Sequence, residues 1–182
     1  QRKVFGCFLD SGKWSAPVVL SQSNGEHYRP VLCGHDDGVQ IAYQTFCKGA
    51  YDLFSRNWTP DRLGRSVKFS LTDEWEMFLR LCSDGAGGVW ATWVVTRDVI
   101  HPKGFADHKV EIMASHFDGK DWMPYRSPDR TKPDGYVAHL YDSLLGRKHY
   151  MGCVGWRRRP QVVREEGGDV WVLYERKEDE RV

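Results

Sequence analysis

The chain repeats one phrase three times: PVLCGHDDGVQIAY at residues 30–43, RLCSDGAGGVWATW at 80–93 and PQVVREEGGDVWVLY at 160–174. Each copy begins with a short apolar run, passes through an acidic, glycine-rich segment and ends in an alternating run that closes on an aromatic residue. Such runs on either side of a Gly and Asp turn are typical of paired β-strands. Self-similarity along a chain indicates a repeat architecture, so we expect an all-β repeat protein.

The spacing of the copies limits which repeat architectures fit the sequence. Val39 and Val89 occupy matching positions and lie 50 residues apart (89 − 39), whereas Val89 and Val170 lie 81 apart (170 − 89). The four-stranded antiparallel blades of a propeller repeat at about 40 to 50 residues. The first spacing therefore favours a β-propeller, and the second predicts an insertion before the third copy.

The segments between the copies complete the blade pattern. Residues 50–58 and 109–119 alternate apolar and polar side chains, which is typical of half-buried strands. DSGKWSAPVVLS at 10–21 and FDGKDWMPYRS at 117–127 then share Asp, Gly, Lys, Trp and Pro in that order. We therefore expect each blade to run as inner strand, acidic turn, second strand, long connection, third strand, DG-K-W turn and outer strand.

This pattern divides the whole chain. It predicts a half blade at 1–21, full blades at 28–72 and 78–127, an insertion at 134–158 and a half blade at 159–182. Joining the halves gives only three blades, whereas ordinary propellers have four to eight. We expect the chain to be part of a longer propeller. The alternative is an arc that closes by oligomerisation, because unsatisfied sheet edges invite partner strands.

Composition excludes several classes of protein. The 182 residues are 41% hydrophobic, enough for one sizeable core. A formal net charge of +1 argues against a nucleic-acid binder, which needs a marked basic excess. No apolar run reaches the roughly 18 residues of a membrane span, and the first residues lack the apolar core of a signal peptide. We expect either a cytoplasmic protein or an extracellular or periplasmic one whose signal peptide lies upstream of this sequence.

The five cysteines are scattered singly, without a CxxC pair. Such spacing gives neither a zinc knuckle nor a redox motif, so we predict no metal and no cofactor. Cys33 and Cys82 occupy nearly matching positions in the first two copies, in apolar surroundings. We interpret these two as small core residues.

The W-S-x-P phrase at 14–17, the two strands that end at Tyr43 and Trp93, and the YDLFSR and KVEIMAS runs resemble the repeats of sialidase-like, BNR-type β-propellers. The resemblance covers most of the chain outside 136–156. It implies the propeller fold, and it allows sialidases, other glycoside-processing enzymes and noncatalytic carbohydrate-binding or scaffold modules. The family's Asp-box, S-x-D-x-G-x-x-W, is only partly present around Trp122, because Asp118 stands one position late.

The resemblance also implies arginines at the starts of inner strands, where they bind the carboxylate of an acidic sugar. Tyr28-Arg29-Pro30 and Arg158-Arg159-Pro160 match this placement loosely, and Arg80 lies at a neighbouring position in the middle copy. Inner strands line the central channel, so planar guanidinium groups there are suited to one shared carboxylate. The alternative is structural: each arginine extends into solvent or pairs with an acidic turn.

The insertion is the second candidate site. Loops longer than about 12 to 15 residues are usually functional or disordered, and this segment is too aromatic for a disordered linker. Residues 136–145 predict a short helix that ends at Gly146. Candidate catalytic residues are Asp142, His139 and Tyr141, and candidate substrate-binding residues are Arg147, His149 and Tyr150. The alternative is an apolar plug across the blade top.

Two function classes therefore stay open. Glycosidases normally need two carboxylates, with a tyrosine nucleophile in sialidases as an exception. The acidic turns, with Asp36, Asp37, Asp84 and Glu165, lie at the opposite blade end from the arginines. The chain is either a glycoside hydrolase acting on an anionic sugar or a noncatalytic module that binds glycan or protein. The partner that we expect first is a carbohydrate or another small anionic ligand.

Overall fold

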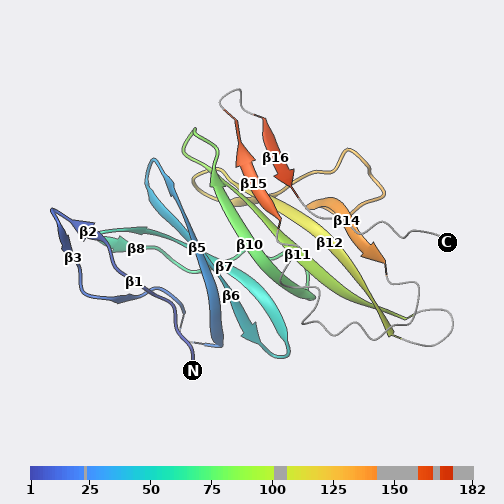
Figure 1. Ribbon diagram of the computed structural model, residues 1–182, viewed down its shortest axis with the longest axis horizontal. Coiled ribbons are helices and arrows are strands. Elements are labelled where there is room, and N and C mark those ends of the chain that lie inside the picture. Colours follow the sequence, from blue (N-terminus) through green and yellow to red (C-terminus); the bar gives the residue numbers. More distant parts are fainter. Residues whose placement is uncertain (23, 101–105, 143–159, 166–168, 174–182) are drawn as a thin grey trace.

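The computed structural model of the chain describes residues 1–22, 24–100, 106–142, 160–165 and 169–173 (Figure 1). Every regular element in these ranges is a β-strand, and all the strand pairs are antiparallel. The all-β class expected from the repeated phrase is therefore confirmed.

The first sheet contains β5 to β9. Its order is β5-β6-β7-β8, and β9 also pairs with β7. The strand bounds are β5 Glu26–His35, β6 Gly38–Cys47, β7 Ala50–Thr59, β8 Arg62–Leu63 and β9 Val67–Lys68. Lys48 and Gly49, both with positive φ, form a two-residue turn between β6 and β7, as in tight hairpins. The long connection expected between the second and third strands is therefore wrong for this sheet.

The second sheet contains β10 to β14. Its order is β10-β11-β12-β13, and β14 also pairs with β12. The strand bounds are β10 Trp75–Ser83, β11 Val89–Ile100, β12 Ala106–Phe117, β13 Trp122–Pro124 and β14 Tyr136–Asp142. Each of the two sheets thus has the predicted sequence of four antiparallel strands along the chain, plus one further strand.

The helix predicted at 136–145 is wrong over Tyr136–Asp142, where the structure has strand β14. Twelve-residue β12 is longer than its partner β13, which covers only residues 115–117 of its outer edge. β14 pairs with residues 109–113 of that same edge. Val137 also packs against the apolar cluster of Val94 and Ile112. Backbone pairing along an open strand edge therefore outweighed the local helix signal.

The N-terminal strands repeat the register of the first sheet. β1 (Phe5–Gly6), β2 (Leu9–Asp10), β3 (Lys13–Trp14) and β4 (Val18–Val19) form the pairs β1-β4 and β2-β3. Leu9 pairs with Trp14 as Trp58 pairs with Leu63, each residue being 49 positions earlier (58 − 9 and 63 − 14). The N-terminal strands therefore correspond to the third and outer strands of a sheet.

The C-terminal hairpin repeats the inner half of a sheet. β15 (Gln161–Arg164) pairs with β16 (Val170–Leu173), and Val163 opposite Trp171 matches Cys82 opposite Trp90. β10 contacts both β5 and β15, and Figure 1 shows these three strands in succession. Each is the first strand of its sheet along the chain, and we refer to β5, β10 and β15 as the inner strands.

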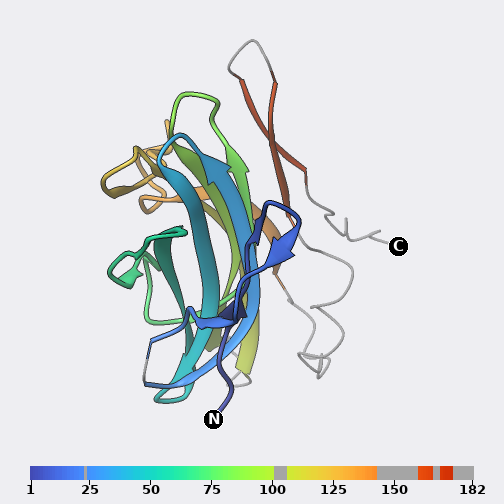
Figure 2. The same ribbon diagram turned by 90° about the vertical axis from the view of Figure 1, so that its left-hand side faces the viewer.

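The sheets pack face to face, and the cores lie between them. Figure 2 shows the N-terminal strands in front of the first sheet and the second sheet behind it. Residues 40–45 of β6 and 91–96 of β11 are buried without interruption, because each of these strands has a neighbour on both faces. One core cluster joins Leu53 of the first sheet to Trp93 and Met113 of the second.

Candidate functional site

The inner strands β5 and β10 are interrupted by β-bulges at matching positions. The ladder of β5 shifts between Tyr28 and Val31, and that of β10 between Met77 and Arg80. Arg29 and Phe78 lie inside these bulges with φ of 48° and 61°, which is uncommon for residues other than glycine. Bulges redirect side chains and frequently lie next to functional sites.

Arg29 reaches from the first sheet to the second. Its Cζ lies 4.8 Å from the centroid of the Phe78 ring, which is within the range of cation–π attraction. Arg29 is exposed, whereas Phe78 is only 9% exposed. The aromatic face therefore holds an exposed guanidinium group beside the inner strands.

Arg80 is not the structural equivalent of Arg29. It pairs with Thr92 just as Val31 pairs with Ala42, so Arg80 corresponds to Val31 and Phe78 corresponds to Arg29. Its Nη1 donates a hydrogen bond to the Leu79 carbonyl at 3.1 Å. The structure thus places Arg29 and Arg80 on neighbouring inner strands but at different levels.

The third arginine, Arg159, lies outside the described residues. The register of β15 with β16 makes Pro160 the equivalent of Leu79, so Arg159 occupies the sequence position of Arg29 and Phe78. Pro160 is buried, as Leu79 is. Convergence of Arg159 with Arg29 stays a prediction.

The candidates in the insertion are placed only in part. His139, Tyr141 and Asp142 lie on β14, opposite Glu111, Val110 and Lys109 of β12. Arg147, His149 and Tyr150 lie outside the described residues. The strand therefore fixes the positions of the three catalytic candidates, while the three binding candidates stay predictions.

Glu76, a residue that the sequence reasoning missed, is a fully buried carboxyl group at the start of β10. Its Oε1 accepts hydrogen bonds from the Leu71 and Thr72 amides and from the Thr72 hydroxyl, at 3.0 to 3.1 Å. Burial raises the pKa of Glu76 to about 7, against the opposing effect of these hydrogen bonds. Glu76 holds the segment that leads into the inner strand.

His27 has the same role in the first sheet. It precedes Tyr28 as Glu76 precedes Met77 at the bulge. Its Nε2 lies 3.1 Å from the Gln22 carbonyl and its Nδ1 lies 3.0 Å from the Thr45 hydroxyl. The shared role at matching positions indicates that Glu76 is a structural residue.

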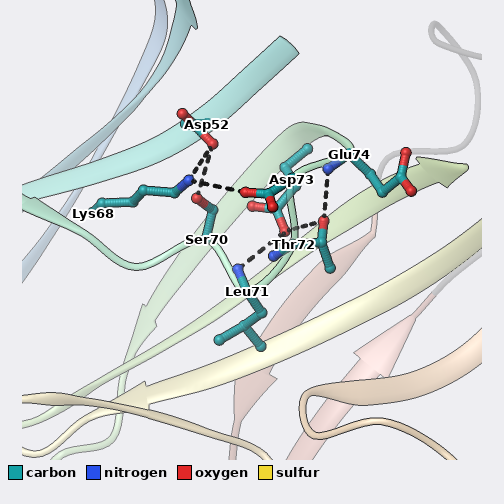
Figure 3. A network of polar contacts seen from close by, with 8 residues as sticks. Asp52, Lys68, Ser70, Leu71, Thr72, Asp73 and Glu74 are labelled. Atoms are coloured by element: carbon teal, nitrogen blue, oxygen red, sulfur yellow. Dashed lines mark hydrogen bonds and ion pairs between the residues drawn. The ribbon is translucent and has the colours of Figure 1, made fainter.

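The connection between the two sheets carries a polar network around Lys68 (Figure 3). Lys68 Nζ pairs with Asp52 at 2.8 Å and more distantly with Asp73 at 3.9 Å, and the Ser70 hydroxyl donates to Asp52 at 3.3 Å. The Thr72 hydroxyl in turn accepts a hydrogen bond from the Glu74 amide. The network ties this connection to β7.

Glu111 is a second buried acid that the sequence reasoning missed. Its side chain is 3% exposed, and it pairs with Arg97 Nε at 3.1 Å and with Lys109 Nζ at 2.7 Å. Breaking a buried pair leaves an uncompensated charge and is costly. The sequence signal for this pair is a glutamate within the otherwise apolar run of residues 110–114, with a basic residue, Arg97, on the preceding strand.

The acidic turn after β10 is closed by Asp84. Its Oδ1 accepts the amides of Ala86 and Gly88, both at 2.8 Å, and its Oδ2 pairs with His116 Nε2 at 2.7 Å. Desolvation opposes ionisation, but these hydrogen bonds and the histidine outweigh it and hold the pKa of Asp84 below its usual value. Asp84 therefore serves the turn.

Within the described ranges, no group of three or more His, Cys, Asp or Glu residues is placed to hold a metal ion. The same ranges contain no helix with the length and apolar character of a membrane crossing. Cys33 and Cys82 lie on neighbouring inner strands as free, half-buried thiols whose pKa values burial raises. A comparison of the chain with protein-family models, curated proteins and solved structures found no match.

Proposed function

We propose that the two sheets are consecutive blades of a β-propeller. Three observations support this proposal: the sheets pack face to face, their inner strands follow one another, and the chain ends repeat matching halves of the same strand pattern. The N-terminal strands and the C-terminal hairpin are then parts of the flanking blades. In this arrangement β5, β10 and β15 line the channel.

The function that the geometry supports best is noncatalytic binding of an acidic glycan at these inner strands. The observation that carries it is the exposed Arg29 guanidinium, held over Phe78 of the next strand. Arg80 adds a second guanidinium on that neighbouring strand. A planar guanidinium pairs with a sugar carboxylate through two parallel hydrogen bonds.

The buried carboxyl groups favour binding over hydrolysis. A glycosidase needs a carboxylic acid that reaches the glycosidic oxygen. Glu76 has a raised pKa, and Glu111 forms buried ion pairs. Both carboxyl groups are buried and bonded to neighbouring protein groups, so neither reaches a bound sugar. Asp84 is engaged by its own turn and by His116. The hydrolase alternative therefore depends on residues such as Asp142.

A glycan array tests the proposal. Sialylated, uronate-bearing and neutral glycans are probed with the wild-type chain, with Arg29→Gln combined with Arg159→Gln, and with Arg62→Gln, an exposed arginine of β8, as the matched control. We expect wild type and R62Q to retain carboxylated glycans and the double variant to lose at least ten-fold in signal. Equal retention by the double variant overturns the proposal.

The same samples are assayed for released monosaccharide. Binding without release supports the noncatalytic function, and release in proportion to protein concentration supports the hydrolase instead. Asp142→Asn then identifies whether that carboxylate is required.

A further inference from the structure

A separate cavity of about 240 Å³ lies between the outer parts of the two sheets. The first sheet contributes Gln40, Ser55, Asn57 and Arg65, and the second contributes Lys120 and Trp122. The volume equals the share of about eight liquid waters, at about 30 Å³ each. It is smaller than the roughly 300 to 1,000 Å³ of pockets for drug-sized ligands, so it suits a molecule of monosaccharide size.

The floor of the cavity is polar and partly unsatisfied. Gln40 pairs with Asn57 across β6 and β7, and Ala42 pairs with Ser55, so these side chains share the face that carries the core residue Leu53. Gln40 is 2% exposed, and its Oε1 has no hydrogen-bond partner among the described residues. A buried carbonyl without a donor is costly, and Gln40 is one of the residues that line the cavity.

One wall is rigid. The Trp122 indole Nε1 donates to Ser55 Oγ at 2.7 Å, and its ring stacks on Phe69 with centroids 4.3 Å apart. Because Ser55 Oγ accepts this bond, its hydroxyl proton is left to donate. A wall fixed in advance lowers the ordering cost of binding.

The rim is cationic. Arg65 and Lys120 are exposed at the cavity, and Asp121 is the acid beside them. Arg56 lies on the opposite face of β7 from Ser55 and Asn57, and its Nη1 donates to the Leu20 carbonyl at 3.1 Å, against the N-terminal segment. The rim therefore favours an anionic group, while the floor offers an acceptor for hydroxyl groups.

We propose that this cavity binds a small hydroxylated carboxylate of hexuronate size. Its carboxylate pairs with Arg65 and Lys120, and one of its hydroxyls donates to Gln40 Oε1. This site is distinct from the inner strands, because its lining comes from the outer part of each sheet.

Calorimetric titration with glucuronate tests the proposal, with glucose and acetate as probes that carry only the hydroxyls or only the charge. We expect saturable binding of glucuronate at least ten-fold tighter than either partial probe. The Trp122 indole N–H resonance, assigned by its loss in Trp122→Phe, shifts in the same titration. Equal binding of acetate, or no saturable binding of glucuronate, overturns the proposal.

Variants separate this site from the inner strands. Arg65→Gln with Lys120→Gln weakens glucuronate binding at least ten-fold, and Gln40→Leu weakens it while circular dichroism shows an unchanged fold. Arg62→Gln leaves it unchanged, and the Arg29→Gln, Arg159→Gln double variant leaves unchanged the shift of the Trp122 indole N–H resonance, which reports on the cavity alone. Unchanged binding in R65Q/K120Q contradicts the cavity assignment, whereas loss of glycan-array binding in R29Q/R159Q alone concerns only the inner strands.

Discussion

At the scale of single residues, Glu76 makes the stability of the fold depend on pH. Its carboxyl group is buried, and desolvation raises its pKa from about 4.5 to about 7. The native state therefore binds a proton that the unfolded chain releases between pH 4.5 and 7. Stability consequently falls as pH rises through this window.

Replacement of Glu76 by Gln should remove the fall in stability between pH 4.5 and pH 7. The amide oxygen still accepts the hydrogen bonds of Leu71 and Thr72, but no charge has to be buried. We expect E76Q to match wild type near pH 4.5 and to be more stable by up to about 3 kcal/mol near pH 8. Urea unfolding at a series of pH values measures the difference.

Glu74→Gln is the control, because Glu74 lies in the same connection and is half-buried. It should leave the pH slope of wild type unchanged. A slope in E76Q equal to that of wild type contradicts the assignment of the raised pKa to Glu76.

Single residues were also where sequence reasoning failed most. It placed Arg29 and Arg80 at or next to the starts of inner strands, whereas β5 begins at Glu26 and β10 at Trp75, so both arginines lie inside their strands. It missed Glu76 and Glu111, because their importance comes from burial and from partners on other strands. It placed Arg80 only near the position of Arg29, and the registers put Arg80 level with Val31, because, between matching strand positions, the turn between β10 and β11 is one residue longer than the turn between β5 and β6.

At the scale of elements, the acidic turn between β10 and β11 depends on Gly88. A Cβ at this position would lie 2.5 Å from the Phe117 carbonyl oxygen and closer still to Asp84 Oδ2. A Cβ at Gly34, near the corresponding turn of the first sheet, would meet nothing within 4 Å. Gly34 therefore serves as the uncrowded control for the crowded Gly88.

We expect Gly88→Ala to destabilise the protein by about 1 to 3 kcal/mol, because backbone and the Asp84–His116 pair must shift. Gly34→Ala should change the free energy of unfolding by less than about 0.5 kcal/mol. Thermal unfolding of both variants checks this. Similar melting temperatures for the two would show that the turn is not closed as described.

The strand pattern was largely predictable from the sequence, since the alternation, the turns and the repeat agreed. The segment from Tyr136 was not, because a few residues with helical character say nothing about an unpaired edge of β12 that lies far away in the sequence. Turn length also escaped prediction: Lys48 and Gly49 close a hairpin without a long connection.

At the scale of the whole molecule, the two sheets share one core. Leu53 of the first sheet and Met113 of the second are both fully buried in the same cluster with Trp93. We expect Leu53→Ala and Met113→Ala each to cost about 2 to 5 kcal/mol. Each variant should lower the midpoint temperature of a single unfolding transition, and circular dichroism and tryptophan fluorescence should report the same midpoint. Two separate transitions, with only one moved by either variant, would mean that the sheets fold independently.

The outer faces of the stack are apolar at both ends of the described chain. Trp14 is 71% exposed among the N-terminal strands, and Trp171 and Leu173 are 57% and 62% exposed on the C-terminal hairpin. Exposed apolar patches are typical of surfaces that contact another element or a partner. The number of blades and oligomerisation stay predictions, as does the closure of the ring.

The central claim is that the inner strands bind an anionic sugar through Arg29, and we propose that Arg159, at the matching sequence position, contributes to the same site. Calorimetric titration of the wild-type chain and of R29Q/R159Q with sialyllactose, with lactose as the neutral control, tests it most directly. The account predicts saturable binding to wild type, at least ten-fold weaker binding to the double variant, and no binding of lactose. Equal affinity of the double variant and wild type for sialyllactose would contradict it.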